Sequence, residues 1–459
     1  MATLADALRQ FGTAYLATHA LSTPQAKAWR AIVACRTAAL GGQQLACDTC
    51  GHSHWQYHSC RHRCCPQCGT RAKDTWLRGR LAEVLPVPYS HLVFTLPHSL
   101  NGLYGMHPRW VIDTLFACAA LTLAEFSANP KWMGRAHGTP AFSLVLHTWT
   151  QDLQRHIHVH AVMACGVLGK DDQWATPTRK PNFLFPVHAL SRVFRGKFMA
   201  ALVAAHKDGN IERDPQGGAP AWHQRQRQLY KHDWVVYAKT PMGGPAQVLE
   251  YLSRYTHRTA ISNERIRSVG QSEVTFKVRA DGQGDKRLVR LQGAEFVRRF
   301  MLHVLPTGIK RIRHYGVLAS ACKAVKLNAA RLALQMPAIK PPSSGVGPSL
   351  HDARRQDGCI AVSVLQDGTA VCHRNAVGTE ATAFTQQHDI AASPGATVMH
   401  RHPHRYSLEC RFAALWEVLR AVHSKSCETR PGHRVEAMMG AHLRPQHICR
   451  RTRSTQTRS

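Results

Sequence analysis

The sequence predicts an α+β fold in which helices pack around one central sheet, preceded by a small helical segment rich in cysteine. Three observations predict it. The first 40 residues show helical periodicity, seven cysteines gather between Cys35 and Cys68, and short β-rich segments alternate with helices from Pro86 onward. Strands interleaved with helices and hairpins are typical of an α+β domain built on one sheet. A chain of 459 residues is long enough for two or three domains.

The chain is strongly basic, with 59 Lys and Arg against 28 Asp and Glu and a formal net charge of +31. Such an excess predicts a polyanionic partner, usually nucleic acid. The alternatives are a ribosomal-type binder or a membrane-surface protein without chemistry. No run approaches 18 apolar residues and no signal peptide is evident, so we expect no membrane partner and a cytoplasmic location. In that reducing compartment, clustered cysteines favour metal over disulfides.

The periodicity of the sequence places the expected elements. Leu4, Leu8, Phe11 and Tyr15 recur at helical spacing, so residues 2–40 should form helices that end before Gly42. Later segments are expected as strands (His91–Leu96, Phe142–His147, His156–Met163 and Trp234–Ala238), as helices (Arg109–Ala128 and Leu190–His206) and as a hairpin (Glu273–Val278 with Lys286–Leu291).

The periodicity is lost after about Ala338. The segment Pro341–Pro348 reads as a linker, and the rest is rich in Arg, His, Ser and Thr with scattered cysteines. Such a segment cannot bury enough apolar surface to order itself, so we expect a largely disordered basic tail. The expected domains are residues 1–80, which are helical and cysteine-rich, residues 86–320, which carry the chemistry, and the tail 339–459.

Two C-x2-C pairs lie in the cysteine-rich block and predict a structural zinc site. Each pair can place two thiolates on one tight turn, and two such turns complete a tetrahedral zinc shell. The alternative is a set of free thiols. Basic side chains between the pairs suit phosphate contact. The expected zinc ligands are Cys47, Cys50, Cys65 and Cys68. Three further thiols could exchange into the shell or support a second metal: Cys35, Cys60 and Cys64. The expected DNA contacts are Arg61 and Arg63.

Three histidines alternate with apolar residues on one expected strand. His156, His158 and His160 are two residues apart, so their side chains share one face of the strand. Neutral imidazoles bind divalent metals well, and a rigid strand holds them without reorganisation. The alternative is a polar, solvent-facing strand surface.

A tyrosine pair follows on an expected helix. Tyr251 and Tyr255 are four residues apart, so their phenols share one helix face. Phenol is a weak nucleophile at its usual pKa near 10 and needs nearby positive charge. Arg254 and Arg258 would supply that charge, and we also expect them to contact DNA. The alternative is that both rings only pack the helix onto the sheet.

Together, a metal on the histidine strand and a nearby tyrosine predict transesterification of a phosphodiester. The metal would polarise the scissile phosphate while a tyrosine attacks it and the 3′ hydroxyl leaves. Because the phosphodiester energy is retained, no nucleotide cofactor is required. The chain also lacks a G-x4-G-K-[ST] loop.

The motifs resemble those of the insertion sequence 91 family of transposases over roughly residues 10 to 335. The resemblance rests on the cysteine block with the run Ser59–Cys68, and on the segments Pro86–His98, His147–His160 and Tyr251–Ser262. It implies the HUH endonuclease fold, with a central antiparallel sheet and flanking helices. It further implies an enzyme that cuts and rejoins single-stranded DNA at transposon ends and targets, in a rolling-circle manner, in the bacterial nucleoid.

Residue by residue, the family pattern implies a catalytic Mg²⁺ or Mn²⁺ on His158 and His160, with Tyr251 and Tyr255 as nucleophiles. It also implies a third metal ligand. Gln151, His147 and His156 are candidates, and we expect Gln151.

The chain departs from the family pattern at two places: Cys64 stands where the family usually has a histidine, and no C-x2-C pair follows Cys322. The missing pair, together with the lost periodicity, suggests a tail translated out of frame. Rival readings are a plasmid-type replication initiator or relaxase, and a zinc-dependent DNA-binding protein without nuclease activity.

Overall fold

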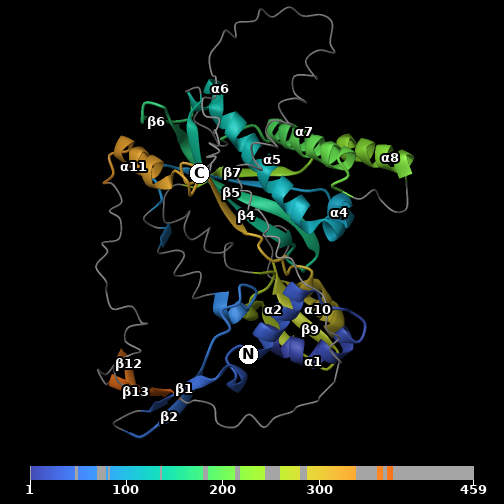
Figure 1. Ribbon diagram of the computed structural model, residues 1–459, viewed down its shortest axis with the longest axis vertical. Coiled ribbons are helices and arrows are strands. Elements are labelled where there is room, and N and C mark those ends of the chain that lie inside the picture. The colour runs from blue at the N-terminus through green and yellow to red at the C-terminus, as the bar shows by residue number, and fades with distance from the viewer. Residues whose placement is uncertain are drawn as a thin grey trace, which may run out of the picture.

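A computed structural model gives the fold, and its central element is an antiparallel sheet (Figure 1). The strand order is β11 (Ile312–Gly316), β4 (Thr139–Trp149), β5 (Arg155–Leu168), β3 (Tyr89–Thr95) and β7 (Val236–Met242), with β6 (Trp174–Ala175) paired to β5. The four expected strands correspond to β3, β4, β5 and β7, and the α+β prediction is confirmed. The structure describes residues 2–46, 50–69, 79–80, 83–134, 137–178, 184–211, 218–242, 259–279, 287–337, 359–364 and 370–375.

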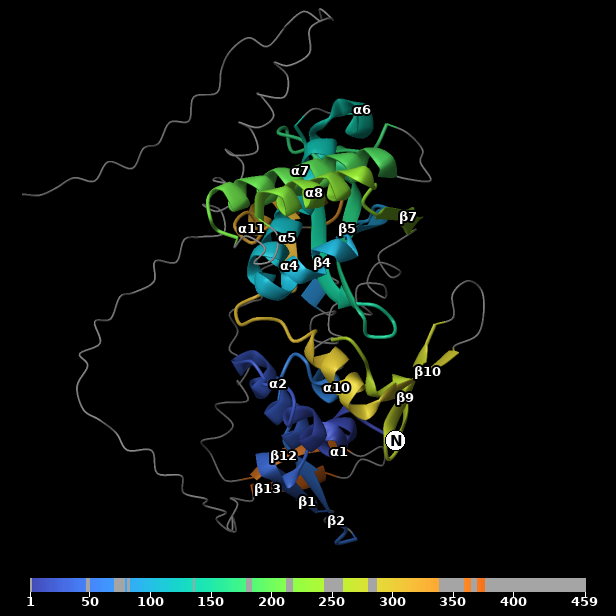
Figure 2. The ribbon, with the colours of Figure 1, turned by 90° about the vertical axis from the view of Figure 1, so that its right-hand side faces the viewer.

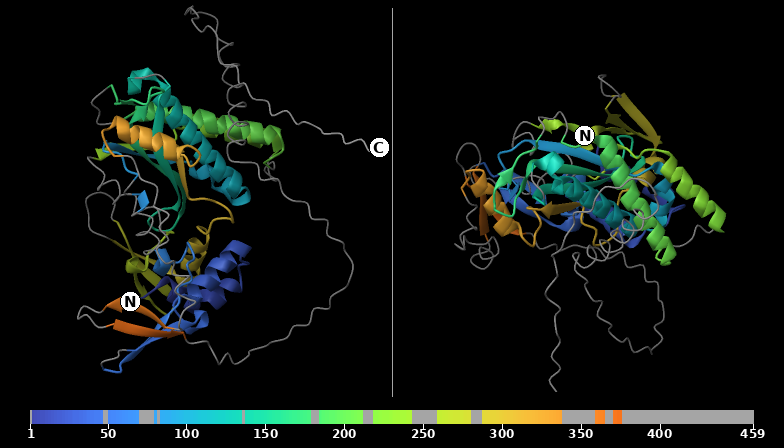
Figure 3. Two further views of the ribbon diagram at one scale, coloured as in Figure 1. Left: turned by 60° about the vertical axis from the view of Figure 1, so that its left-hand side comes forward. Right: turned by 90° about the horizontal axis from the view of Figure 1, so that it is seen from above.

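The two faces of the central sheet are covered by different helices. Side chains at alternate positions of β5, such as Val159 and Ala161, pack with α5 (Pro108–Ala128) and α7 (Val187–Lys207) in the main apolar core. These two helices run next to each other along the sheet (Figures 1 and 3). Val162 and Ala164 point to the opposite face, where they pack with α11 (Lys323–Ala333). This period of two is what a strand buried on both faces requires.

Helix α5 is long and apolar enough to cross a membrane, and no other helix among the described residues is. In the structure 78% of its apolar window is buried inside the protein. It therefore serves as the central helix of the core, which is the usual position of a helix that is apolar all round.

A second unit combines the N-terminal helices with residues 266–301, which follow much later in the chain (Figure 2). Helices α1 (Leu4–Leu16) and α2 (Thr23–Ala34) share one core with α10 (Gly293–Met301) and the sheet β10 (Arg287–Gln292), β9 (Glu273–Val278), β8 (Ile266–Val269). The expected hairpin at residues 273–291 is thus present as β9 and β10, but it lies outside the central sheet. The expected boundary at residue 80 does not separate two independent cores, because α1 packs directly against α10.

A third, small sheet joins β1 (Gly42–Ala46) and β2 (Ser53–Tyr57) to two strands of the C-terminal segment. Its order is β12 (Cys359–Val364), β13 (Ala370–Asn375), β1, β2, and β13 is antiparallel to β1. Sequence periodicity did not indicate these two strands. The rest of the expected tail lies outside the described residues.

The remaining elements are short or peripheral. They are η1 (Ala38–Leu40), η2 (His98–Leu100), α4 (Asn101–Met106), α6 (Pro130–Met133), α8 (Gly218–Lys231) and η3 (Asn263–Arg265).

Candidate active site and cysteine cluster

Three buried histidines converge on one face of the central sheet. His158 and His160 lie on β5, and His147 on β4 is the register partner of His158. Partners in an antiparallel pair project to the same side, so the three rings meet. His160 Nε2 lies 3.1 Å from both His158 Nε2 and His147 Nδ1. All three side chains are at least 90% buried, and their ligand atoms lie within 4.8 Å of one another.

The electrostatics of this cluster keep the imidazoles neutral. Burial, followed by the neighbouring His91 and His156, lowers the pKa of His160 to about 3. Burial, followed by His160 and His156, lowers the pKa of His158 well below its usual value. Neutral rings keep lone pairs available, and three of them at this spacing suit a divalent cation. The donor set therefore suits a divalent cation without identifying it.

Neighbouring groups fix which nitrogen of each ring faces the cluster. His158 Nδ1 lies 2.9 Å from the carbonyl oxygen of His156, to which it can donate, and this leaves Nε2 for the cluster. His160 Nδ1 lies 2.9 Å from Nε2 of His91 on β3. Partners of this kind orient metal ligands and set their tautomers. Sequence reasoning missed His91, although it lies in the segment Pro86–His98 that carries part of the family resemblance.

An aromatic and cationic stack supports His147 from the side. The Trp149 ring stacks on His147 with centroids 4.5 Å apart, and the Arg311 guanidinium lies 5.1 Å from the Trp149 centroid. Arg311 also donates to Thr259 Oγ1 at 2.9 Å. Burial, more than any neighbour, lowers the pKa of Arg311 to about 10, so it stays cationic at neutral pH. Sequence reasoning missed both Trp149 and Arg311.

The structure places Gln151, the expected third ligand, away from the histidine cluster. Gln151 is exposed in the turn between β4 and β5, where its carbonyl oxygen accepts a hydrogen bond from Arg265. The turn closes through Thr150 N donating to Gln154 O at 3.0 Å, which takes Gln151 out of the sheet. His147, which remains in the strand, lies beside His158 and His160 instead. His156, the other candidate, pairs with His98 at 2.9 Å.

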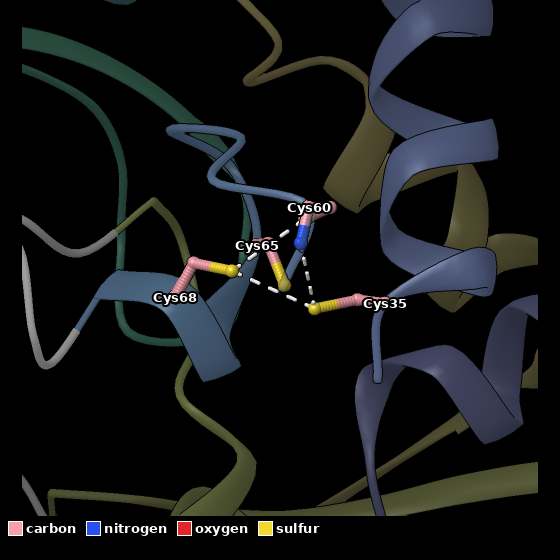
Figure 4. Close-up of side chains that lie close together, drawn as sticks. All are labelled: Cys35, Cys60, Cys65 and Cys68. Atoms are coloured by element: carbon pink, nitrogen blue, oxygen red, sulfur yellow. Dashed lines mark hydrogen bonds between the residues drawn. The ribbon is translucent and has the colours of Figure 1, made fainter. Parts of the chain in front are cut away.

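Four cysteines converge near the end of α2 (Figure 4). Cys35 caps α2, Cys60 follows β2, and Cys65 and Cys68 lie on one short turn. Cys68 Sγ is 3.5 Å from Cys35 Sγ and 3.6 Å from Cys60 Sγ. Burial raises the pKa of Cys60 to about 12, and burial also raises the pKa of Cys65. A bound cation would offset that cost by stabilising the thiolates, so four sulfurs here fit zinc.

Two of the four expected zinc ligands lie in this cluster. Cys65 and Cys68 belong to the cluster, whereas Cys50 is exposed and apart from it, and Cys47 lies outside the described residues. Cys35 and Cys60, which the sequence offered only as exchangeable thiols, complete the four. They are 25 residues apart, and only the packing of α2 against the cysteine-rich loop brings them together.

Cys64 does not join this cluster. It is buried, and burial raises its pKa.

The two arginines expected to contact DNA differ in their surroundings. Arg63 donates to the carbonyl oxygens of Ile309 at 2.8 Å and Leu305 at 3.1 Å. Arg61 is exposed. The other expected DNA contacts, Arg254 and Arg258, and both expected nucleophiles, Tyr251 and Tyr255, lie outside the described residues.

Two family models match the chain. One, described as "Putative transposase", matches residues 142–326, which include the histidine cluster. The other, described as "Transposase zinc-binding domain", matches residues 7–96, which include the cysteine cluster. These matches define the class: the chain is a transposase with an N-terminal zinc-binding domain, and transposases cleave DNA and transfer its strands.

Two relatives narrow the class to a family. "Putative transposase y4qJ" of Sinorhizobium fredii (strain NBRC 101917 / NGR234) is 40% identical over 361 residues, which cover 77% of this chain and 89% of that protein. The transposase for insertion sequence element IS801 of Pseudomonas savastanoi pv. phaseolicola is 25% identical over 300 residues, covering 63% of this chain and 69% of that protein. No solved structure matches. The chain belongs to the insertion sequence 91 family of transposases.

Proposed function

We propose that this transposase nicks and rejoins single-stranded DNA at insertion-sequence ends by metal-assisted transesterification through a 5′-phosphotyrosine. The observation that carries the proposal is the buried cluster His147, His158 and His160, three neutral imidazoles that converge with no carboxylate of the described residues in the cluster. Such a set has little structural use in a sheet, because each buried imidazole costs desolvation. It suits a divalent cation that contacts phosphate.

In this proposal the three histidines hold Mg²⁺ or Mn²⁺, which when bound would polarise the scissile phosphate and offset its developing charge. Tyr251 or Tyr255 supplies the nucleophile. Its phenol oxygen forms a bond to phosphorus as the bond to the 3′ oxygen breaks, and the phenol proton passes to the departing 3′ hydroxyl through solvent. The energy of the phosphodiester is kept in the phosphotyrosine, so the reverse attack by a 3′ hydroxyl rejoins a strand without a nucleotide cofactor.

Two tyrosines four residues apart support strand exchange rather than simple nicking. One phenol holds the first 5′ end, and the second can cleave another strand before the first is released. On a helix their Cβ atoms would be about 5 to 6 Å apart, so both could serve one metal site. This arrangement is what rolling-circle transposition requires.

We also propose that Cys35, Cys60, Cys65 and Cys68 ligate the structural zinc of the N-terminal domain. All four positions of that shell are protein thiols, so the zinc has no open site for chemistry. The net charge of +31 supports single-stranded DNA, at transposon ends and at the target, as the partner.

The proposal is tested by incubating the protein with labelled single-stranded element ends and Mn²⁺, followed by denaturing gels. We expect cleavage and a protein-linked strand. His158→Ala and His160→Ala should abolish both products and leave salt-sensitive DNA binding close to wild type, because binding rests on Lys and Arg. Undiminished nicking by the double variant would remove the histidines from the active site.

A further inference from the structure

A pocket opens directly beside the histidine cluster. It has a volume of about 260 Å³. One wall consists of the segment after β3 with His98, together with His156 at the start of β5. The other wall consists of the end of α8 and the residues that lead into β7, including Leu229 and Trp234. The ring centroid of His156 is 4.9 Å from that of the cluster residue His158, so this wall of the pocket adjoins the proposed metal site.

The pocket is held rigidly by its own backbone. Thr95 N donates to Val235 O at 3.0 Å, which ties the two walls together. Trp234 is 2% exposed, its indole donates to Leu229 O at 3.1 Å, and its carbonyl accepts from Ser191. Preorganised walls lower the cost of ordering a ligand.

The lining favours a flat, neutral ligand over a phosphate. Although the chain is strongly basic, no Lys or Arg is among the described residues that line this pocket, and Asp233 supplies a carboxylate whose Oδ1 accepts from Arg195 Nη1 at 3.3 Å. That ion pair leaves the other carboxylate oxygen to accept hydrogen bonds from amino or imino groups. The His98–His156 pair uses one nitrogen of each ring, so His98 Nδ1 and His156 Nε2 lie outside that bond. Leu96, Leu229 and Trp234 provide apolar surface.

The opposite side of α8 is basic and aromatic, whereas no Lys or Arg is among the described residues that line the pocket. A shallow hollow there is lined by Arg227, Lys231 and the half-exposed Tyr230, whose ring lies 5.9 Å from the Arg195 guanidinium. Basic and aromatic side chains of this kind follow the backbone of single strands. Helix α8 thus separates a surface suited to phosphates from a pocket suited to a base.

We propose that this pocket binds the nucleobase of a nucleotide that flanks the scissile phosphate. A phosphate at the histidine cluster brings its own nucleosides beside His156, and one base turned out of the strand enters between His98 and Leu229. Holding that base fixes the register of the strand on the metal. This inference rests on the proposed function, because it takes the histidine cluster as the site of the scissile phosphate.

The test is a scan of single abasic residues along a labelled single-stranded oligonucleotide of the element end, with affinity for the zinc-loaded protein measured by fluorescence anisotropy without added Mg²⁺ or Mn²⁺. We expect one position to lower affinity by about tenfold, the usual contribution of one bound base. Gln228→Trp, which places an indole at the exposed rim of the pocket, should weaken the intact strand by the same factor. The same variant should leave the affinity for the strand that is abasic at that position unchanged. His188→Trp, at an exposed position on α7 outside the pocket, is the matched control and should alter neither.

Two results would overturn the base pocket: a scan in which no position matters, and a Gln228→Trp variant that weakens the intact and abasic strands equally. His232→Ala, a milder change at the same rim, should reduce the abasic effect without filling the pocket. The scan measures affinity alone, so it gives a result even if the protein cuts no strand. Loss of the proposed function would appear separately, as absence of nicking and of a protein-linked strand with Mn²⁺.

Discussion

At the scale of single residues, the site depends on the orientation of each imidazole. His160 can present Nε2 to a cation only if its Nδ1 carries the proton, and His91 Nε2, 2.9 Å away, is the acceptor for that proton. His91 is 3% exposed, so water cannot easily replace it. In the proposed metal site, His91 would therefore act as a positioning residue for the ligand His160 rather than as a ligand itself.

Replacing His91 should weaken metal binding without removing any ligand. We expect His91→Leu and the polar variant His91→Gln to lower Mn²⁺ affinity by about 10- to 100-fold, the usual cost of losing such a partner. Electron paramagnetic resonance titration of the zinc-loaded protein measures this directly. His188→Leu, exposed on α7, is the control. Wild-type Mn²⁺ affinity in both His91 variants would show that His160 needs no such support.

Single residues also show how far the sequence could predict the site. The shared face of His158 and His160 follows from the strand period of two, which is local. The role of His147 follows from the register between β4 and β5, and the turn that removes Gln151 from the sheet is part of the same pairing. Cys35 joins Cys65 only through the packing of α2. Periodicity within one segment encodes neither the strand register that places His147 nor the helix packing that places Cys35.

At the scale of elements, the N-terminal unit depends on close packing between α1 and α10. Gly293 begins α10, and a Cβ atom there would overlap the ring of Phe11 on α1. Phe11 is 7% exposed and has neighbours on all sides, so it cannot simply move away. The spacing of the two helices therefore requires glycine at this position.

Gly293→Ala should destabilise the protein by about 1–3 kcal/mol, the usual cost of overpacking. Gly196→Ala provides the matched control within α7, because nothing lies within 4 Å of its added Cβ. Alanine is the better helix former by roughly 0.5–1 kcal/mol, so the control should be neutral or stabilising. Urea denaturation followed by circular dichroism compares the two. Equal stability of both variants would contradict the close α1–α10 contact.

Helix α10 also carries an ion-pair network with a defined pH dependence. Hydrogen bonds from Arg298, then from Arg299, lower the pKa of Glu295 to about 2 from its usual value of 4.5. A lowered carboxyl pKa in the folded state contributes stability that is present above pH 4.5 and is lost as the pH falls toward 2. The Glu295 side chain is 31% exposed, so solvent screening keeps the contribution below about 1 kcal/mol.

Glu295→Gln should therefore be slightly less stable than wild type at pH 6 and equal to it near pH 2. Thermal melts at a series of pH values give the difference. A constant difference across that range would show that Glu295 is not paired in the folded protein.

At the scale of the whole molecule, the cysteine-rich loop joins the two units. Arg63 lies between Cys60 and Cys65, and its guanidinium donates to carbonyls at residues 305 and 309. That segment leads from α10 to β11, the edge strand beside β4. Arg311 in the same segment supports the stack of Trp149 on His147. The zinc-binding loop is thus connected by direct contacts to the histidine cluster.

Arg63→Ala should change stability, whereas Arg61→Ala should change DNA binding. Loss of three charge-assisted hydrogen bonds to backbone carbonyls should cost Arg63→Ala about 1–3 kcal/mol of unfolding free energy and weaken Mn²⁺ binding, with zinc content unchanged. Arg61→Ala should keep its stability within about 0.5 kcal/mol and lower the salt dependence of DNA binding. Denaturation, metal analysis and salt titration separate the two. If Arg63→Ala changed only DNA affinity, the loop would be a DNA contact and not a connector.

The central claim, that strand cleavage proceeds through a phosphotyrosine on Tyr251 or Tyr255, is tested most directly by mass spectrometry of the DNA-linked peptide after nuclease and trypsin digestion. Trypsin cuts after Arg254 and so separates the two candidates, into residues 240–254 and 255–258. We predict a nucleotide adduct on one of these two peptides, its transfer to the other in the corresponding Tyr→Phe variant, and none in the double variant. An adduct on any other residue, or cleaved strands with no adduct, would contradict the account.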